Sequence, residues 1–163
     1  MKDLLKSFVY AFKGIAYCIC NERNMRIHLC FTAYMFGFLT VYDFFEVSKG
    51  QLAVLIGLCA LVMALEAVNT AVEKAVDLET REINELARIS KDAAAGAVLI
   101  AAIGSVAAGI AILNQPEAFA KMFENYKENI PVFVGCIISF IASLVFVFAG
   151  PKGIKNFFKN HVK

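Results

Sequence analysis

The chain alternates long apolar stretches with short charged segments. Four apolar stretches cover roughly residues 27–48, 50–72, 91–114 and 130–151. A helix rises about 1.5 Å per residue, so each stretch is long enough, or nearly so, to cross about 30 Å of hydrocarbon. The pattern therefore predicts an all-α membrane protein with four spanning helices.

A different pattern precedes the first stretch. At about 100° per residue, an apolar row from Leu4 to Ile19 falls on one side of a helix, with Lys2, Lys6 and Lys13 on the other. This is typical of an amphipathic helix that lies in the membrane interface, with its lysines near anionic headgroups. A soluble helix packed on a partner is the alternative.

The composition agrees with a membrane location. Hydrophobic residues occupy 60% of the 163 positions, more than the roughly one half that is usual in soluble domains. The five cysteines are odd in number and lack a C-x-x-C spacing, which argues against a disulfide framework or a zinc site. The net charge of +2 matters only through where the charges fall, and we expect no nucleic-acid partner.

Basic residues cluster on one side of the predicted spans. The positive-inside rule then places both termini and the loop between the second and third spans in the cytoplasm, as an even number of spans requires. Only Lys49, Lys121 and Lys127 fall on the opposite side. The cytoplasmic set is Lys2, Lys6, Lys13, Arg23, Arg26, Lys74, Arg81, Arg88, Lys91, Lys152, Lys155, Lys159 and Lys163.

The second span carries a row of polar residues. Glu66, Asn69, Glu73 and Asp77 fall within an arc of about 80° on one helix face. A charged residue inside a membrane helix costs at least a few kcal/mol, so such residues usually face a bundle interior and mark a functional path. Asp77, and with it Glu73, has the alternative of being solvated at the cytoplasmic helix end, whereas Glu66 lies two turns deeper.

Two carboxylates are candidate ligands for a divalent cation. Hard oxygen ligands suit Mg²⁺, and Glu22 stands at the cytoplasmic start of the first span, level with Glu73. The alternative for Glu22 is a surface carboxylate paired with Arg23 or Arg26.

The third span begins with Lys91 and Asp92, followed by a run of small residues from Ala93 to Gly96. The small residues allow another helix backbone to approach closely. Lys91 and Asp92 are candidates for binding phosphate and a cation, or else they are interfacial anchors.

Three motifs together resemble a known family. They are "ALEAVNTAVEKAVDL", "KDAAAGAVL", and "NERN" followed by His28. The chain resembles the small bacterial integral-membrane lipid kinases, the diacylglycerol kinase and undecaprenol kinase family, over about residues 5–114. "NERN", His28 and Ala95 resemble the undecaprenol kinase branch more than the diacylglycerol kinase branch.

The resemblance implies a homotrimer in a bacterial cell membrane. Each protomer would have a surface helix and three spans, active sites would lie between protomers on the cytoplasmic side, and a phosphoryl group would pass from MgATP to the hydroxyl of a membrane lipid.

The resemblance also implies a role for each matching residue. Glu66 would be the general base, Asn69 a positioning residue, and Glu22 and Glu73 the Mg²⁺ ligands; Lys91 and Asp92 would contact the ATP phosphates, Tyr10 and the segment Glu82 to Asn84 would help to hold ATP, and Ala95 would line the lipid site.

The expected division is a lipid kinase core, residues 1–114, and a C-terminal extension, residues 115–163. The family's usual chain ends soon after the third span, whereas this one adds a fourth span and a basic tail. We expect the fourth span to pack outside the trimer and the tail to bind anionic headgroups.

The sequence thus predicts an ATP- and Mg²⁺-dependent undecaprenol kinase. A diacylglycerol kinase that produces phosphatidic acid would use the same catalytic residues. A small transporter or channel subunit, with Glu66, Asn69 and Glu73 along a cation path, is the alternative from another class.

Overall fold

The computed structural model describes residues 2–80, 82 and 84–161, without the side chains of Lys2 and His161. Within these residues every regular element is an α-helix, which confirms the predicted all-α fold. Arg81 and Lys163, which entered the charge count, lie outside the described residues. The helices are α1 (Lys2–Asn21), α2 (Arg23–Val41), α3 (Lys49–Glu79), α4 (Glu85–Leu113), α5 (Pro116–Glu128) and α6 (Ile130–His161).

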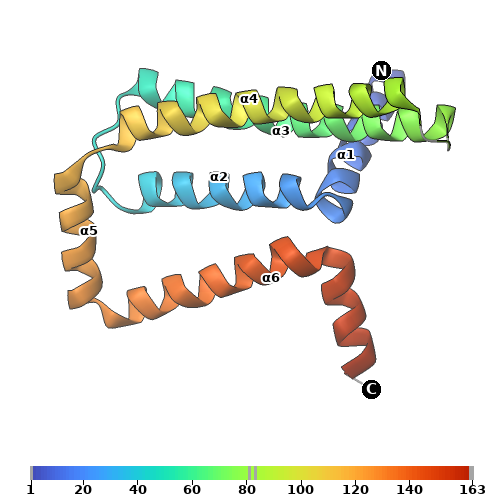
Figure 1. Ribbon diagram of the computed structural model, residues 1–163. Helices are drawn as coiled ribbons and strands as arrows, with labels where there is room; N and C mark the ends of the chain where they lie inside the picture. The colour runs from blue at the N-terminus through green and yellow to red at the C-terminus, as the bar shows by residue number, and fades with distance from the viewer. Residues whose placement is uncertain (1, 81, 83, 162–163) are drawn as a thin grey trace.

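The long helices form a bundle closed at one end by α5. Helices α3 and α4 lie side by side and share the most extensive packing, α2 packs on α3, and α6 packs on α2 (Figure 1). Helix α1 crosses the opposite end of the bundle, where it contacts α2, α3 and α6. Both chain termini and the α3–α4 connection lie at that same end (Figure 1).

Three helices, α3, α4 and α6, are long and apolar enough to cross a membrane. Helix α2 has 19 residues and lies along α3, but polar Arg23, Asn24, Arg26 and His28 occupy its first two turns (Figure 1). The predicted core, residues 1–114, therefore contains two helices of clear spanning character, α3 and α4, and a third, α2, whose apolar part is shorter.

The predicted end of the first span at residue 48 is wrong. Helix α2 ends at Val41, and Tyr42 is extended. The aromatic residues that follow pack at the bundle end: the rings of Tyr42 and Phe44 stack at 5.1 Å, and Phe45 meets Phe119 of α5 edge-on at 5.3 Å. Apolar side chains in this loop cover the helix ends and do not extend the span.

Polar side chains fix the connections between helices. The Ser48 hydroxyl accepts a hydrogen bond from Gln51 N at 3.3 Å, and the Gln51 side chain accepts one from Ser48 N at 2.9 Å, which forms a capping box at the start of α3. Gln115 exchanges two hydrogen bonds with the backbone of Glu46, both at 3.0 Å, and so ties the α2–α3 loop to the end of α4.

Two prolines mark the C-terminal third. Pro116 follows the end of α4 at Leu113 and occupies the first turn of α5, a short amphipathic helix at the start of the C-terminal extension. In α6 the helix breaks at Gly150, with φ 65° and ψ 169°, directly before Pro151. The apolar span thus ends near the predicted residue 151, and the basic tail continues as a separate helical segment (Figure 1).

Replacing Ser48 by alanine is expected to lower the free energy of unfolding by about 1 kcal/mol, because the first turn of α3 loses its cap. The measurement is reversible unfolding in mixed micelles. Ser7→Ala is the control, since the Ser7 hydroxyl only donates to Asp3 O within an exposed helix. Equal stability of the two variants would contradict a stabilising cap.

Candidate active site

The polar row on α3 runs from the bundle interior to the surface. Glu66 is only 3% exposed, whereas the Asp77 side chain is 53% exposed. Asn69 and Glu73 lie between these extremes. The gradient follows from helix geometry, since each residue of the row lies about one turn beyond the last. The exposure of Asp77 supports the alternative that this carboxylate is simply solvated at the helix end. The burial of Glu66 excludes the same alternative for Glu66.

Glu66 is a buried carboxylate that faces α2. Its Oε1 atom lies 3.5 Å from Nε2 of His28. Asn24 and Glu22, at the start of α2, lie within electrostatic reach of the same carboxylate. No lysine or arginine in the described ranges forms an ion pair with Glu66. Burial of a carboxylate is costly without a compensating charge, which marks Glu66 as a functional group.

Asn69 lies between Glu66 and Glu73 in the polar row and contacts Glu73. Its Nδ2 atom donates to Glu73 Oε1 at 3.1 Å. Its Oδ1 atom is buried and has no hydrogen-bond partner within the described part of the chain. Buried acceptors are rarely left unpaired, so this oxygen is available to a ligand hydroxyl or to another donor.

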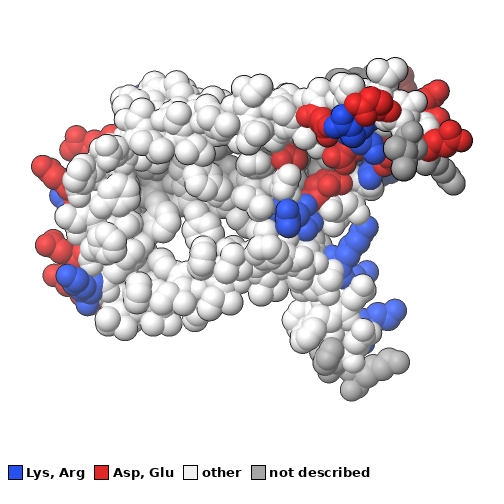
Figure 2. All heavy atoms as spheres, in the orientation of Figure 1, with Lys and Arg blue, Asp and Glu red and all other residues white. Residues whose placement is uncertain are grey.

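Lys91 of α4 reaches across to the polar row. Its Nζ atom lies 2.5 Å from Asp77 Oδ1. Asp92 pairs instead with Arg88, at 2.9 Å, and Arg88 also binds Glu85 at 2.6 Å. These pairs belong to the charged cluster at the α3–α4 end of the molecule, beside the largely uncharged bundle (Figure 2). The sequence analysis had not assigned Arg88 to this cluster.

Glu22 lies at the junction of α1 and α2. It is half-buried at the cap position of α2, with extended backbone. No ion pair in the described residues joins it to Arg23 or Arg26, so the structure does not support the surface-pair alternative. The described residues contain no group of three or more His, Cys, Asp or Glu side chains arranged for a metal ion. The Glu22 and Glu73 pair stays a prediction.

The other predicted residues lie apart from Glu66 in this single chain. Tyr10 is 66% exposed on α1, and Ala95 is exposed on α4. Glu82 is exposed, and the Asn84 side chain caps α4 by accepting from Leu86 N and Ala87 N at 2.8 and 3.3 Å. Ile83, within the segment expected to hold ATP, lies outside the described residues. The roles expected for these residues therefore stay predictions.

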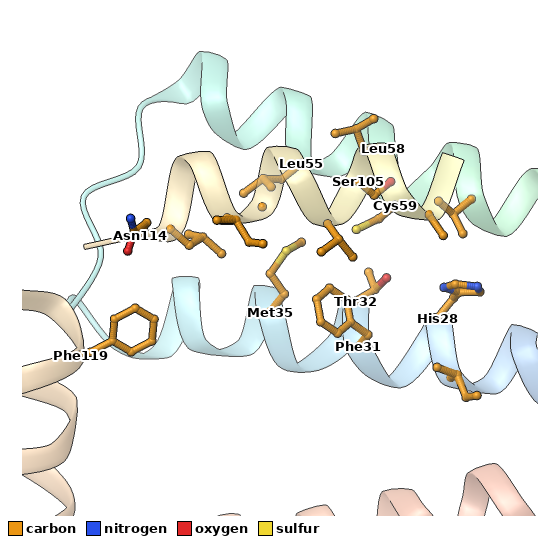
Figure 3. A pocket seen from close by; sticks show the side chains of 17 residues that line it. His28, Phe31, Thr32, Met35, Leu55, Leu58, Cys59, Ser105, Asn114 and Phe119 are labelled. Carbon is orange, nitrogen blue, oxygen red and sulfur yellow. The ribbon is translucent and has the colours of Figure 1, made fainter. Parts of the chain in front are cut away.

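An apolar cavity of about 580 Å³ is lined by His28, the neighbour of Glu66. It lies among α2, α3 and α4, with His28 at one end and Phe119 at the other (Figure 3). Met35, Leu55 and Ser105 are among the side chains that line it. Glu66 itself does not line the cavity, but His28 both contacts Glu66 and lines it, so one side chain lies between the buried carboxylate and the apolar space. The sequence had left the role of His28 open.

Comparison with known proteins decides the family. The family model described as prokaryotic diacylglycerol kinase matches residues 9–113. The chain belongs to the prokaryotic diacylglycerol kinase family. The predicted lipid kinase resemblance is thereby confirmed, and the transporter alternative loses its support. The match ends at the C-terminus of α4, so α5 and α6 lie outside the matched residues.

Members of the prokaryotic diacylglycerol kinase family with both expected names are similar to this chain. A diacylglycerol kinase of Synechocystis sp. is 44% identical over 115 residues, which are 70% of this chain and 64% of that relative. An undecaprenol kinase of Bacillus subtilis is 38% identical over 114 residues, 69% of this chain and 89% of the relative. A diacylglycerol kinase of Haemophilus influenzae is 37% identical over 112 residues, 68% and 92% of the two chains. No solved structure gives a significant match.

Asn69→Leu is expected to change the free energy of unfolding by less than about 1 kcal/mol, because removal of the unpaired buried Oδ1 offsets the loss of the hydrogen bond from Nδ2 to Glu73. Thr70→Val, at the neighbouring position, is expected to cost about 1 kcal/mol, since the buried Thr70 hydroxyl donates to Glu66 O at 3.0 Å. Reversible unfolding of both variants checks this order. A larger loss for Asn69→Leu than for Thr70→Val would contradict this balance.

Proposed function

We propose that the protein is an ATP- and Mg²⁺-dependent lipid kinase that phosphorylates undecaprenol on the cytoplasmic side of a bacterial membrane. The observation that carries the proposal is the continuity of three features: a buried carboxylate, Glu66, an apolar cavity at its side and a charged cluster at the exposed end of the same helix face. Such a site suits a reaction between a long apolar substrate and a highly charged one.

The chemistry is phosphoryl transfer. The lipid hydroxyl oxygen attacks the γ-phosphorus of ATP, the bond to the β,γ-bridging oxygen breaks, and ADP leaves. Glu66 accepts the hydroxyl proton as general base, and Asn69, one turn along the same helix face, is a positioning residue for the substrate. Glu66 suits the role of base because it is buried and no lysine or arginine of the described residues pairs with its carboxylate.

Transfer of the phosphoryl group requires positive charge beside the ATP phosphates. Glu22 and Glu73 would hold Mg²⁺, whose chemistry is to neutralise charge on the phosphate oxygens. The donor set fits: both residues are half-buried carboxylates, and Glu73 is oriented by Asn69. Lys91 approaches the ATP phosphates from α4 by exchanging its contact with Asp77.

The choice of undecaprenol rests on "NERN", His28 and Ala95, the residues that resemble the undecaprenol kinase branch. His28 contacts Glu66 and lines the apolar cavity. A residue that resembles the undecaprenol kinase branch would therefore lie beside the proposed reacting group. Diacylglycerol is the second candidate, since the 44% identical relative is a diacylglycerol kinase. Either lipid would lay an apolar chain in the cavity.

The proposal includes a homotrimer with sites between protomers. Its support in this chain is the exposure of Tyr10, Glu82 and Ala95, which lie away from Glu66 of their own protomer. In a trimer a neighbouring copy would bring them to the site. The distribution of basic residues supports a cytoplasmic location for the termini and for the α3–α4 connection.

The direct test offers undecaprenol and diacylglycerol separately to the purified full-length protein with radiolabelled ATP, with and without Mg²⁺. We expect Mg²⁺-dependent labelling of undecaprenol. If diacylglycerol is labelled too, its kcat/KM should be lower than that of undecaprenol. A preference for diacylglycerol would replace the proposed substrate by the second candidate. Labelling of neither lipid would overturn both assignments.

Filling the cavity is expected to act on the lipid alone. Ala102 lines the cavity on α4, so Ala102→Phe should raise the KM for lipid about tenfold by displacing part of the chain, while the KM for ATP stays unchanged. Ile100→Phe is the matched control, because Ile100 is 75% exposed and does not line the cavity. Equal effects of the two variants would show that the lipid chain lies elsewhere.

A further inference from the structure

Arg26 is a buried arginine whose partners are backbone carbonyls. It is 6% exposed, and no carboxylate of the described chain forms an ion pair with it. Its Nε donates to Val147 O at 3.0 Å, and its Nη1 donates to Ile19 O at 3.1 Å. A buried charge needs such partners, and here one guanidinium joins the ends of two helices, α1 and α6, that are distant in sequence.

Both carbonyls are of the kind that a helix leaves unpaired at its end. Ile19 lies in the last turn of α1, which stops at Asn21. Val147 lies four residues before Pro151, and proline has no N–H to complete the helical bond to that oxygen. The C-terminal end of a helix carries partial negative charge, so a cation is favoured at each of these two ends.

The break in α6 fits the guanidinium closely. Gly150 adopts φ 65°, and a Cβ atom at this position would lie 3.1 Å from Arg26 Cζ. Glycine is therefore required both by the backbone conformation and by the approach of Arg26. Nearby, Lys152 Nζ donates to Asn21 Oδ1 at 2.5 Å, which adds a second link between α6 and the end of α1. We call Arg26, Ile19, Val147, Gly150 and Pro151 the Arg26 latch.

The Arg26 latch holds the start of α2, which carries candidate site residues. Arg26 lies in the first turns of α2, between Glu22 at its cap and His28 beside Glu66. Its anchors Val147, Gly150 and Pro151 come from α6, outside the residues 9–113 that match the family. We propose that α6 positions the α1–α2 junction through Arg26, so that Glu22 and His28 face the polar row of α3. This inference rests on the proposed function and makes the C-terminal span a working part of the kinase, with Arg26 as a positioning residue.

The test uses two single substitutions on the α6 side, in the full chain. Gly150→Ala introduces a Cβ against the guanidinium, and Pro151→Ala supplies an N–H that competes for Val147 O. Two controls keep the same helix pair. Gly135→Ala adds a methyl group in open space on α6, and Tyr34→Phe removes the other α2–α6 hydrogen bond, between the hydroxyls of Tyr34 and Ser139 at 2.7 Å.

The main readout is binding of Mn²⁺, as a probe for Mg²⁺, in the presence of a non-hydrolysable ATP analogue, followed by the electron paramagnetic resonance signal of the free ion. Gly150→Ala and Pro151→Ala should each weaken Mn²⁺ binding about tenfold, the range found when groups that orient metal ligands are removed. The half-saturating Mg²⁺ concentration for turnover should rise in parallel, and the controls should bind Mn²⁺ as the unaltered protein does.

The role of the latch would be overturned by a lack of Mn²⁺ binding in the unaltered protein, or by equal Mn²⁺ binding in all variants. Reduced thermal stability with unchanged Mn²⁺ binding would also overturn it, since α6 would then only stabilise the fold. If the unaltered protein phosphorylates neither lipid, the proposed function fails, and the Mn²⁺ titration still decides whether Arg26 positions Glu22.

Discussion

A polar group inside a membrane bundle must find its partner within the protein, because hydrocarbon offers none. Two buried polar side chains meet this requirement in ways that shape the fold. The Arg26 guanidinium donates to the free carbonyls of two helix ends, and the Thr70 hydroxyl donates to the backbone oxygen of Glu66. Two other groups meet it poorly: the Glu66 carboxylate, which has no lysine or arginine partner among the described residues, and the Asn69 oxygen, which has no partner among them. The stable part of the bundle therefore surrounds a small set of groups that are left available to a substrate.

Hydrophobic periodicity was sufficient to predict the long helices of the bundle and the amphipathic helix α1. The position of α1 in the membrane interface stays a prediction. It failed where apolar residues serve another purpose. Phe44 and Phe45 extended the apparent first span, yet they pack over the bundle end, and the short helix α5 was hidden in a segment of mixed polarity. Such contacts depend on residues far apart in the chain, so a pattern read along one segment does not contain them.

The candidate site, too, could be predicted from the sequence only in part. The carboxylate row on α3 follows from helical spacing alone, and the family resemblance gave its members roles. The contact between His28 and Glu66 and the cavity that continues from it required the packing of α2 on α3. No sequence motif predicts the Arg26 latch, because its acceptors are backbone carbonyls, which every residue has. Only Gly150 and Pro151 are residue types that indicate it in the sequence. Both residues lie in the segment outside the family match.

The most direct test of the account is the single-turnover rate of phosphoryl transfer in Glu66→Gln, measured with saturating MgATP and undecaprenol. Glutamine keeps the shape of the side chain but accepts no proton, so the rate should fall roughly 10³-fold or more, the combined scale of base catalysis and substrate positioning. Glu79→Gln, at the exposed end of the same helix, should retain the original rate. A near-normal rate in a folded Glu66→Gln protein would contradict the account, because the buried carboxylate around which the site is built would then take no part in the chemistry.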